Sequence, residues 1–176
     1  MTVKEVYESV TQGGSTDFAE AAAILNIAGP WCLIGGLAVN CFVDPVLTVD
    51  ADIVFASENR PRVRDTFSAA GFQLEAFPHS LYAIKPKSKL RIQFTHDLRY
   101  QEFIKRATQR EVLGIMVPVA KLEDIIQGKL WAWQDSERRP TKRKKDELDL
   151  MRIGEAFPEL RKVIPTEIIS QLKGGS

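Results

Sequence analysis

A chain of 176 residues with 44% hydrophobic and 27% charged residues has the composition of an ordinary globular protein and can bury a core. Its formal net charge of +1 excludes a global attraction to nucleic acid or to membranes, so such binding would need a local cluster of charge. No apolar run has the length of a membrane span, and the first residues lack the hydrophobic core of a signal peptide, so we expect a cytoplasmic protein.

Hydrophobic periodicity and turn residues predict an alternation of helices and strands, followed by a helical end. In chain order the expected elements are helices over 3–10 and 16–25, a strand over 31–34, a helix over 37–42, a strand over 48–55, a helix over 58–70, strands over 72–76, 80–84 and 90–95, a short helix over 100–107, two strand pieces around a glycine within 111–119, and helices over 120–134, 144–157 and 166–172. Ser15 or Thr16 is the expected cap of the second helix. The third helix is expected to end at Asp44-Pro45, because the residue before a proline is pushed out of the helical region.

Strands dominate the first two thirds of the chain and helices the last third, which predicts an α/β to α+β fold with flanking helices. The expected organisation is an α/β core with N-terminal helices over residues 1–119, a helical C-terminal part over 120–173 packed on that core, and a disordered tail over 174–176. Residues 135–143, which are mostly polar, are expected to form a loop.

Two groups of residues are expected to be buried outside the candidate site. Cys32 and Cys41 lie in apolar sequence without the paired spacing of a zinc site, so they are predicted to be buried free thiols. Leu148, Met151 and Ile153 are predicted to form the buried stripe of the helix over 144–157.

The strand over residues 48–55 contains the clearest indication of chemistry. Side chains alternate between the faces of a strand, so Asp50 and Asp52 point the same way, with their Cα atoms roughly 6.6 Å apart. Two such like charges raise one another's pKa or bind a cation, and oxygen ligands suit Mg²⁺ or Mn²⁺. The alternative is that both carboxylates lie on the solvated face of an amphipathic strand.

The pair Gly35-Gly36 lies where the first strand turns into a helix. Glycines at such a turn expose backbone N–H groups at the positive end of a helix, where phosphate binds, although ordinary tight turns use glycine as well. Thr48 adds a hydroxyl on the same face as Asp50. A phosphate site followed by two carboxylates is what an NTP bridged to Mg²⁺ would need.

These residues resemble the nucleotidyltransferase superfamily that includes DNA polymerase β, and especially its small bacterial branch with the AbiEii-type toxins. The motifs follow in family order from about Trp31 to Asp149. They are Gly35-Gly36-Leu37-Ala38, then Thr48-Val49-Asp50-Ala51-Asp52-Ile53, then a helix that carries Lys129, and then Lys145-Asp146-Glu147-Leu148-Asp149. Each motif is short, and the resemblance rests on their joint occurrence.

The resemblance implies a mixed sheet whose site transfers a nucleoside monophosphate from an NTP to an acceptor by in-line attack at the α-phosphate. It implies Mg²⁺ or Mn²⁺ at the catalytic residues Asp50 and Asp52. It also implies that Gly35, Gly36 and Thr48 bind the nucleotide.

The later motifs add three residues to the implied nucleotide site. Lys129 would contact phosphate, although a lysine on an amphipathic helix can equally be solvated. Asp146 and Asp149 lie one helical turn apart, so they would face the same side and could cap Lys129 or another basic side chain. As isolated features they would be read as surface charges.

Two positions depart from the family pattern. Val46 stands where the family usually has an arginine. Gln93 stands at the expected position of the third catalytic carboxylate, and an amide is a neutral ligand that cannot act as a base. Asp97 is the nearest carboxylate in sequence, but it would fall beyond the end of its strand. A weak enzyme, altered metal use or a binding protein on the same scaffold would each fit this change.

The basic run over residues 138–145 would suit an RNA acceptor, and Trp131 and Trp133 could stack bases. The alternative is a solvated loop beside a helix with core tryptophans. The leading hypothesis is an Mg²⁺-dependent nucleotidyltransferase, with a toxin-like role and an antitoxin-like partner as a further hypothesis. The alternatives are a catalytically silent nucleotide- or RNA-binding module and a glycosyltransferase that uses the two aspartates to hold Mn²⁺ and a nucleotide sugar.

Overall fold

The protein, seen in a computed structural model that describes residues 2–174, is built on one seven-stranded sheet. The strands are Trp31–Ile34 (β1), Asp50–Phe55 (β2), Gln73–Phe77 (β3), Ser80–Ile84 (β4), Arg91–Thr95 (β5), Thr108–Val112 (β6) and Ile115–Val119 (β7). Their order across the sheet is β3-β4-β5-β2-β1-β7-β6. Strand β2 runs parallel to β5, and β1 runs antiparallel to β2 but parallel to β7. The sheet is therefore mixed, as the resemblance implies.

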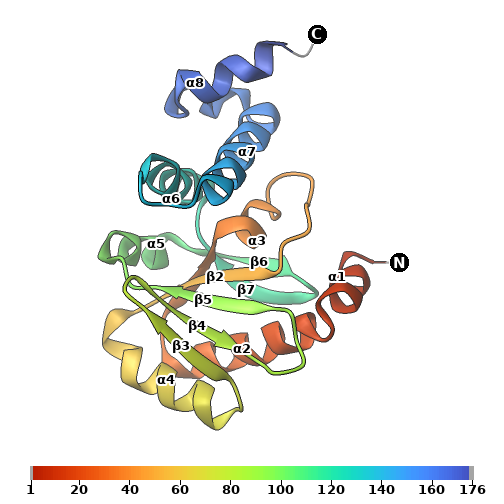
Figure 1. Ribbon diagram of the computed structural model, residues 1–176, viewed down its shortest axis with the longest axis vertical. Helices are drawn as coiled ribbons and strands as arrows, with labels where there is room; N and C mark the ends of the chain where they lie inside the picture. Colours follow the sequence, from red (N-terminus) through yellow and green to blue (C-terminus); the bar gives the residue numbers. More distant parts are fainter. Residues whose placement is uncertain (1, 175–176) are drawn as a thin grey trace.

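Helices cover both faces of this sheet, which confirms the expected fold class. The α-helices of the described chain are Val3–Thr11 (α1), Gly14–Ala28 (α2), Gly35–Val39 (α3), Arg60–Ala69 (α4), Gln101–Arg106 (α5), Leu122–Gln134 (α6), Pro140–Ala156 (α7) and Thr166–Ile169 (α8). Short 3-10 turns lie at Ser57–Asn59, Leu98–Tyr100, Pro158–Val163 and Ser170–Gly174. Figure 1 shows α2 and α4 on one side of the sheet, and α3, α5 and the C-terminal helices α6, α7 and α8 on the other.

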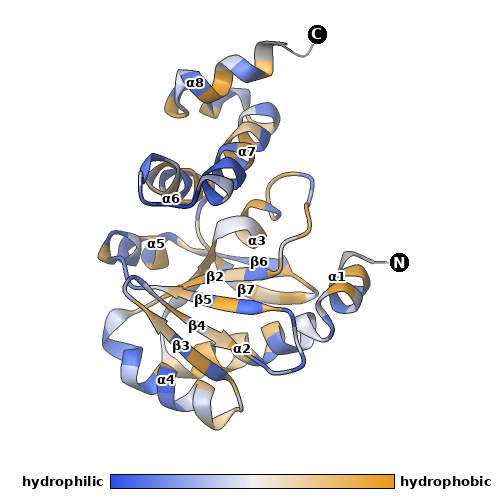
Figure 2. Cartoon of the chain, viewed as in Figure 1, coloured by the Kyte–Doolittle hydropathy of each residue, from blue (hydrophilic) through white to orange (hydrophobic). Residues whose placement is uncertain are grey.

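The alternation of side chains along β2 separates the core from the candidate site. Ile53 and Phe55 are buried, and Phe55 packs edge-on against Phe94 of β5 at a ring-centroid distance of 5.3 Å. Asp50 and Asp52 are only partly buried on the opposite face. Figure 2 shows apolar residues along the strands and hydrophilic residues over most of α4. The strand therefore carries its carboxylates toward the side of the sheet that faces the C-terminal helices.

Two helices that border the site begin earlier than the sequence predicts. Helix α3 begins at Gly35, because the φ of +70° at this glycine turns the chain directly from β1 into the helix, and it ends at Val39, well before Pro45. Helix α7 begins at Pro140, inside the stretch predicted to be a loop. Proline suits the first helical position, since its missing N–H needs no partner there. As a result, Lys142 lies on α7.

The predicted cap of α2 at Ser15 or Thr16 is wrong. Helix α2 begins at Gly14, and its N-cap, Gly13, has no side chain that could cap it. Instead, Glu8 of α1 accepts hydrogen bonds from the backbone N–H of Ser15, at 2.8 Å, and from the hydroxyl of Thr16, at 3.1 Å. A carboxylate from the preceding helix thus satisfies free groups at the start of α2.

The buried face of α7 matches the predicted stripe at Ile153, which is buried, and at Met151, which packs partly buried against the core, but not at Leu148. Leu148 is 50% exposed, whereas Leu150 is fully buried. Asp146 and Asp149 are buried as well, because their carboxylates face Lys129 of the neighbouring helix α6. A hydrophobic pattern cannot predict this face, since it assigns charged residues to the surface.

Both cysteines are free, as predicted, with Cys32 buried and Cys41 partly buried. Within the described range, none of the helices combines the length and the apolar character needed to cross a membrane. The predicted disordered tail begins at Gly174, but this residue closes the last 3-10 turn, and residues 175–176 lie outside the described part of the chain.

Candidate functional site

Polar side chains meet on one face of the sheet, where β2 and β5 run side by side. The register pairs Asp50 with Arg91 and Asp52 with Gln93. Because residues two apart on a strand share a face, all four side chains belong to the same face of the sheet. Gln93 therefore lies beside Asp52, as the sequence predicts.

Basic side chains hold both oxygens of the Asp50 carboxylate. Arg91 Nε lies 2.8 Å from Oδ1, and Lys142 Nζ lies 3.0 Å from Oδ2. Burial raises the pKa of Asp50, but the ion pairs with Lys142 and Arg91 outweigh burial and hold this pKa below its usual value. Asp50 is therefore ionised, and a metal ion that bound it would have to share or displace these cations.

Asp52 has different surroundings, because no basic side chain in the described range forms an ion pair with it. Burial raises the pKa of Asp52 to about 6, the charge of Lys129 opposes this rise, and the charge of Asp50 adds to it. The carboxylate lies directly against the start of α3, where a Cβ on Gly35 would collide with Oδ2 of Asp52. Glycine is thus required at position 35 both for its positive φ and for space.

The second glycine of the pair faces Thr48. A Cβ on Gly36 would lie 3.6 Å from the Thr48 hydroxyl oxygen, which is an ordinary contact, so position 36 tolerates a small side chain sterically. The Thr48 hydroxyl lies 3.4 Å from the backbone nitrogen of Asp50. Thr48 therefore lies at the start of β2, between α3 and the first aspartate.

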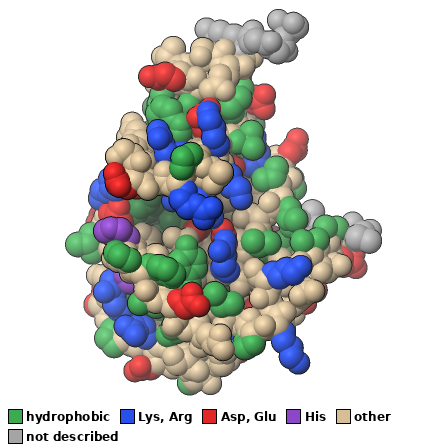
Figure 3. All heavy atoms as spheres, in the orientation of Figure 1, with side chains coloured by type: hydrophobic (Ala, Val, Ile, Leu, Met, Phe, Trp, Pro, Cys, Tyr) green, Lys and Arg blue, Asp and Glu red, His purple; other side chains and the backbone are tan. Residues whose placement is uncertain are grey.

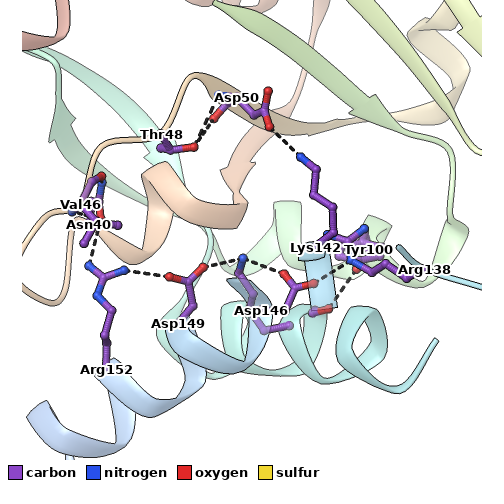
Figure 4. A network of polar contacts seen from close by, with 12 residues as sticks. Asn40, Val46, Thr48, Asp50, Tyr100, Arg138, Lys142, Asp146, Asp149 and Arg152 are labelled. Carbon is purple, nitrogen blue, oxygen red and sulfur yellow. Dashed lines mark hydrogen bonds and ion pairs between the residues drawn. The ribbon is translucent and has the colours of Figure 1, made fainter. Parts of the chain in front are cut away.

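Lys129 is the centre of a buried ionic network between α6 and α7, in which it binds Asp146 and Asp149, both labelled in Figure 4. Its Nζ lies 3.0 Å from Asp146 and 2.7 Å from Asp149, and its side chain is 11% exposed. Burial lowers the pKa of Lys129, but Asp149 and Asp146 outweigh burial and raise this pKa above its usual value. Arg138 and Arg152 bind the outer sides of the two carboxylates, at 2.7 and 2.8 Å. The two aspartates thus cap Lys129, as the sequence predicts.

The network leads to a stability prediction for Lys129→Met. Removal of this cation leaves Asp146 and Asp149 buried with only Arg138 and Arg152, and breaking a buried ion pair typically costs about 3–5 kcal/mol. We expect the free energy of unfolding in urea to fall by about 3 kcal/mol, since two cations remain. As a control, Lys105→Met removes an exposed ion pair and should leave the unfolding curve unchanged. Equal stability of both variants would contradict a structural role for Lys129.

A cavity of about 840 Å³ lies between the sheet and the C-terminal helices. Asp52, Gln93 and Lys129 line it together with an aromatic wall, in which Tyr100 packs edge-on against Trp131 at 5.2 Å. Figure 3 shows basic side chains gathered across the middle of the drawn face, between the sheet and these helices. The volume lies in the range of small-molecule sites.

No family model and no curated protein sequence matches the chain. Solved structures match most of its length. ANT(2'')-Ia in complex with adenylyl-2''-tobramycin has a TM-score of 0.58 and 17% identity, over 90% of this chain and 98% of that one. An antigenic nucleotidyltransferase-like protein from Paracoccidioides brasiliensis has a TM-score of 0.54 and 15% identity, over 81% of this chain and 76% of that one. The chain has the nucleotidyltransferase fold.

The lincosamide antibiotic adenylyltransferase LnuA, bound to lincomycin, shares the nucleotidyltransferase fold with a TM-score of 0.50 and 13% identity. The match covers 85% of this chain and 96% of that one. At these identities the likeness concerns the fold alone. Membership of the AbiEii-type branch stays a prediction.

On this nucleotidyltransferase fold, the carboxylate pair fits one divalent ion. Asp50 and Asp52 offer hard oxygen ligands, which suit Mg²⁺ or Mn²⁺ with water and phosphate oxygens as the other ligands. The third polar residue, Gln93, is neutral, and its Oε1 already accepts a hydrogen bond from the Tyr82 hydroxyl at 3.0 Å. Among the described residues, no group of three or more His, Cys, Asp or Glu side chains is arranged to hold a metal. At this site the described part of the chain therefore supplies no third acidic ligand.

Sequence reasoning missed Lys142 and Arg138 as members of the site and grouped them in a basic run. Recognition of Pro140 as the first residue of α7 would have found Lys142. It then precedes Asp146 by four residues and Asp149 by seven, a spacing that places all three on one side of the helix. The pairing of Lys142 with Asp50 remains invisible in the sequence, because 92 residues separate them.

The other candidates lie near the site without joining the carboxylate pair. Asp97 follows the end of β5, as predicted, where it caps the next turn and binds Arg99 at 2.6 Å. Trp131 lines the cavity, whereas Trp133 donates a hydrogen bond to Glu147 at 3.1 Å. Trp131 is therefore the tryptophan that a bound ring could reach.

Proposed function

We propose that this protein transfers a nucleoside monophosphate from an NTP to an acceptor. The observation that carries the proposal is the position of the carboxylate pair. Asp52 lies against the glycine that starts α3, beside Asp50, and lines a cavity of about 840 Å³ whose opposite side carries Lys129. Two proteins with a similar fold support the proposal. LnuA is named as an adenylyltransferase, and ANT(2'')-Ia was solved in complex with an adenylylated antibiotic.

In this reaction a nucleophilic atom of the acceptor bonds to the α-phosphorus of the NTP. The bond from that phosphorus to the bridging oxygen breaks, pyrophosphate leaves with the electron pair, and the acceptor loses its proton to solvent. Asp50 and Asp52 would hold the divalent ion, which neutralises negative charge on the phosphates when it is bound. The backbone of Gly35 and Gly36 would bind phosphate oxygens, with the Thr48 hydroxyl beside them.

Lys129 would act on the nucleotide mainly as a fixed positive charge. Two of the three donors of its ammonium group face Asp146 and Asp149, and its charge acts on Asp52 as well. The third donor would be left for a phosphate oxygen in the cavity. Asp146 and Asp149 would thus serve the nucleotide by positioning Lys129.

We propose a small molecule as the acceptor ahead of RNA. Most of the basic side chains that would suit RNA already have a partner within the protein: Arg138 binds Asp146, Lys142 binds Asp50, Arg143 donates to the backbone oxygen of Trp133, and Lys144, although exposed, binds Glu147. The matched structures contain adenylyl-2''-tobramycin and lincomycin, which makes tobramycin and lincomycin the first acceptors to test. A toxin-like role in the cytoplasm with an antitoxin-like partner would instead require an RNA or protein acceptor.

The test is to incubate the protein with each α-labelled NTP, Mg²⁺ or Mn²⁺, and one acceptor at a time: tobramycin, lincomycin, total RNA or a cell extract. We expect label on one acceptor class, with release of pyrophosphate. Absence of label on every one of these acceptors would contradict the proposed transfer.

The amide of Gln93 favours a second candidate, a catalytically silent nucleotide-binding module. A neutral side chain at this position cannot take a proton from an acceptor, and its oxygen is already bound by Tyr82. This candidate predicts binding of metal and NTP without transfer of label to any acceptor. The labelling experiment and a binding measurement therefore separate the two functions.

Binding of Mg²⁺ and an NTP is predicted to raise the melting temperature. A ligand that binds only the folded state stabilises it by about 2.7 kcal/mol at 100 times its Kd, which corresponds to roughly 5–10 °C for a chain of this size. The measurement is thermal unfolding with millimolar NTP and Mg²⁺, with the same NTP in EDTA as the control. An unchanged melting temperature would count against both nucleotide functions.

A further inference from the structure

We infer that Lys142 and Arg91 supply, at Asp50, the positive charge that a second divalent ion would otherwise supply, so that this site binds a single metal ion with its NTP. This inference rests on the proposed function and assigns its metal count. It starts from the carboxylate of Asp50, in which each oxygen already binds a basic side chain that a metal ion would have to share. Arg91 Nε binds Oδ1 at 2.8 Å and Lys142 Nζ binds Oδ2 at 3.0 Å.

The positive charges of Arg91 and Lys142 already match the negative charges of the carboxylate pair. Asp50 and Asp52 carry two negative charges when both are ionised, and Arg91 and Lys142 carry two positive ones. In a two-metal site the two ions lie about 4 Å apart. Acidic side chains that bind both ions usually bridge them. Beside Asp52, where β5 offers the next side chain, Gln93 adds no charge. A second ion would therefore meet two cations and no additional carboxylate.

The position of Lys142 is set by the fold, because the helix that carries it is anchored beside the site. On the same helix α7, four and seven residues after Lys142, Asp146 and Asp149 bind the buried Lys129 of α6. Figure 4 shows the Lys142 side chain extending from this helix to Asp50. The Lys142 side chain is 32% exposed, so it is partly accessible to solvent while it binds Asp50.

The neutral residue at position 93 is also fixed by its neighbours. Tyr82 of β4 is the register partner of Gln93, and its hydroxyl donates to the Gln93 amide oxygen. Gln93 lines the cavity, and with its oxygen bound to Tyr82 its amide nitrogen can serve there only as a donor. A donor at this place favours phosphate or acceptor oxygen over a metal ion, which agrees with a single-ion site.

The experiment uses equilibrium dialysis with Mn²⁺ and a non-hydrolysable NTP analogue. The result is the number of Mn²⁺ ions that the protein retains for each molecule of analogue that it retains. We expect one Mn²⁺ for the wild type and one for Gln93→Asp, in which Lys142 still holds Asp50. The double variant Lys142→Met with Gln93→Asp should retain two. Two matched doubles in the Gln93→Asp background should retain one: Lys144→Met, which removes a neighbouring exposed lysine, and Lys142→Arg, which keeps the charge.

Two Mn²⁺ ions on the wild type or on Gln93→Asp would overturn the inference, and so would one ion on the Lys142→Met double variant. Circular dichroism checks that each variant is folded, and Lys142→Gln in the same background replaces Lys142→Met if that variant does not fold. A wild type that retains neither analogue nor Mn²⁺ would overturn the proposed function as well. A wild type that retains the analogue with two ions would overturn the metal count alone.

Discussion

Replacement of Asp50 and Asp52 together by asparagine is expected to abolish metal-dependent NTP binding and leave the fold intact. Asparagine keeps the shape of each side chain but removes both charges that would hold the ion. The metal interaction is worth several kcal/mol, so the Kd for Mn²⁺ with an NTP should rise by about 100-fold or more. Arg91 and Lys142, which lose their partner, are 46% and 32% exposed and can turn to solvent.

The measurement is titration calorimetry, with unfolding in urea to follow the fold. The charge-matched control is Glu58→Gln with Asp65→Asn, two exposed residues near and on α4, away from the site. This control should bind like the wild type. Unfolding of the Asp50 and Asp52 double variant would show that the pair is structural, and undiminished binding would place the nucleotide elsewhere.

Gln93→Asp is expected to tighten Mn²⁺ binding and to raise any transfer rate. The new carboxylate would lie beside Asp52 on the neighbouring strand, where it adds the negative charge that the pair lacks and a group that can accept a proton from the acceptor. General acid–base assistance is typically worth about 10²–10⁴-fold, so a slow or inactive wild type should become a measurably faster transferase. Initial rates with saturating NTP and acceptor give the comparison.

The neutral control for this position is Gln93→Asn, which changes the shape without adding charge and should not raise the rate. If the wild type is already active and Gln93→Asp changes neither metal affinity nor turnover, the third ligand lies elsewhere. Asp97 would then be the next residue to replace, although Arg99 holds its carboxylate with three hydrogen bonds.

The parts of the fold that depend on local sequence could be predicted. The alternation along β2 placed Asp50 and Asp52 on one face, because strand geometry fixes that pattern over a few residues. The position of Gln93 beside Asp52 followed from one further assumption, that β5 pairs with β2. The spacing of Asp146 and Asp149 likewise indicated that both face one basic partner.

The remaining errors share a physical cause, which is that long-range contacts decided the outcome. Leu148 is exposed because the buried face of α7 carries the carboxylates of Asp146 and Asp149 together with Leu150 and Ile153. The start of α7 at Pro140 was hidden by the polar composition of the stretch around it. The ion pair between Lys142 and Asp50 joins α7 to β2. These elements are far apart in the sequence, so no local pattern encodes the contact.

Parallel reactions with α-labelled and γ-labelled NTP test most directly whether the Asp50 and Asp52 pair directs nucleotidyl transfer. We expect label from the α position, and none from the γ position, on the acceptor, with one pyrophosphate released per transfer and no transfer by the Asp50→Asn, Asp52→Asn double variant. Movement of the γ label, or transfer that survives in the double variant, would contradict this role of the pair.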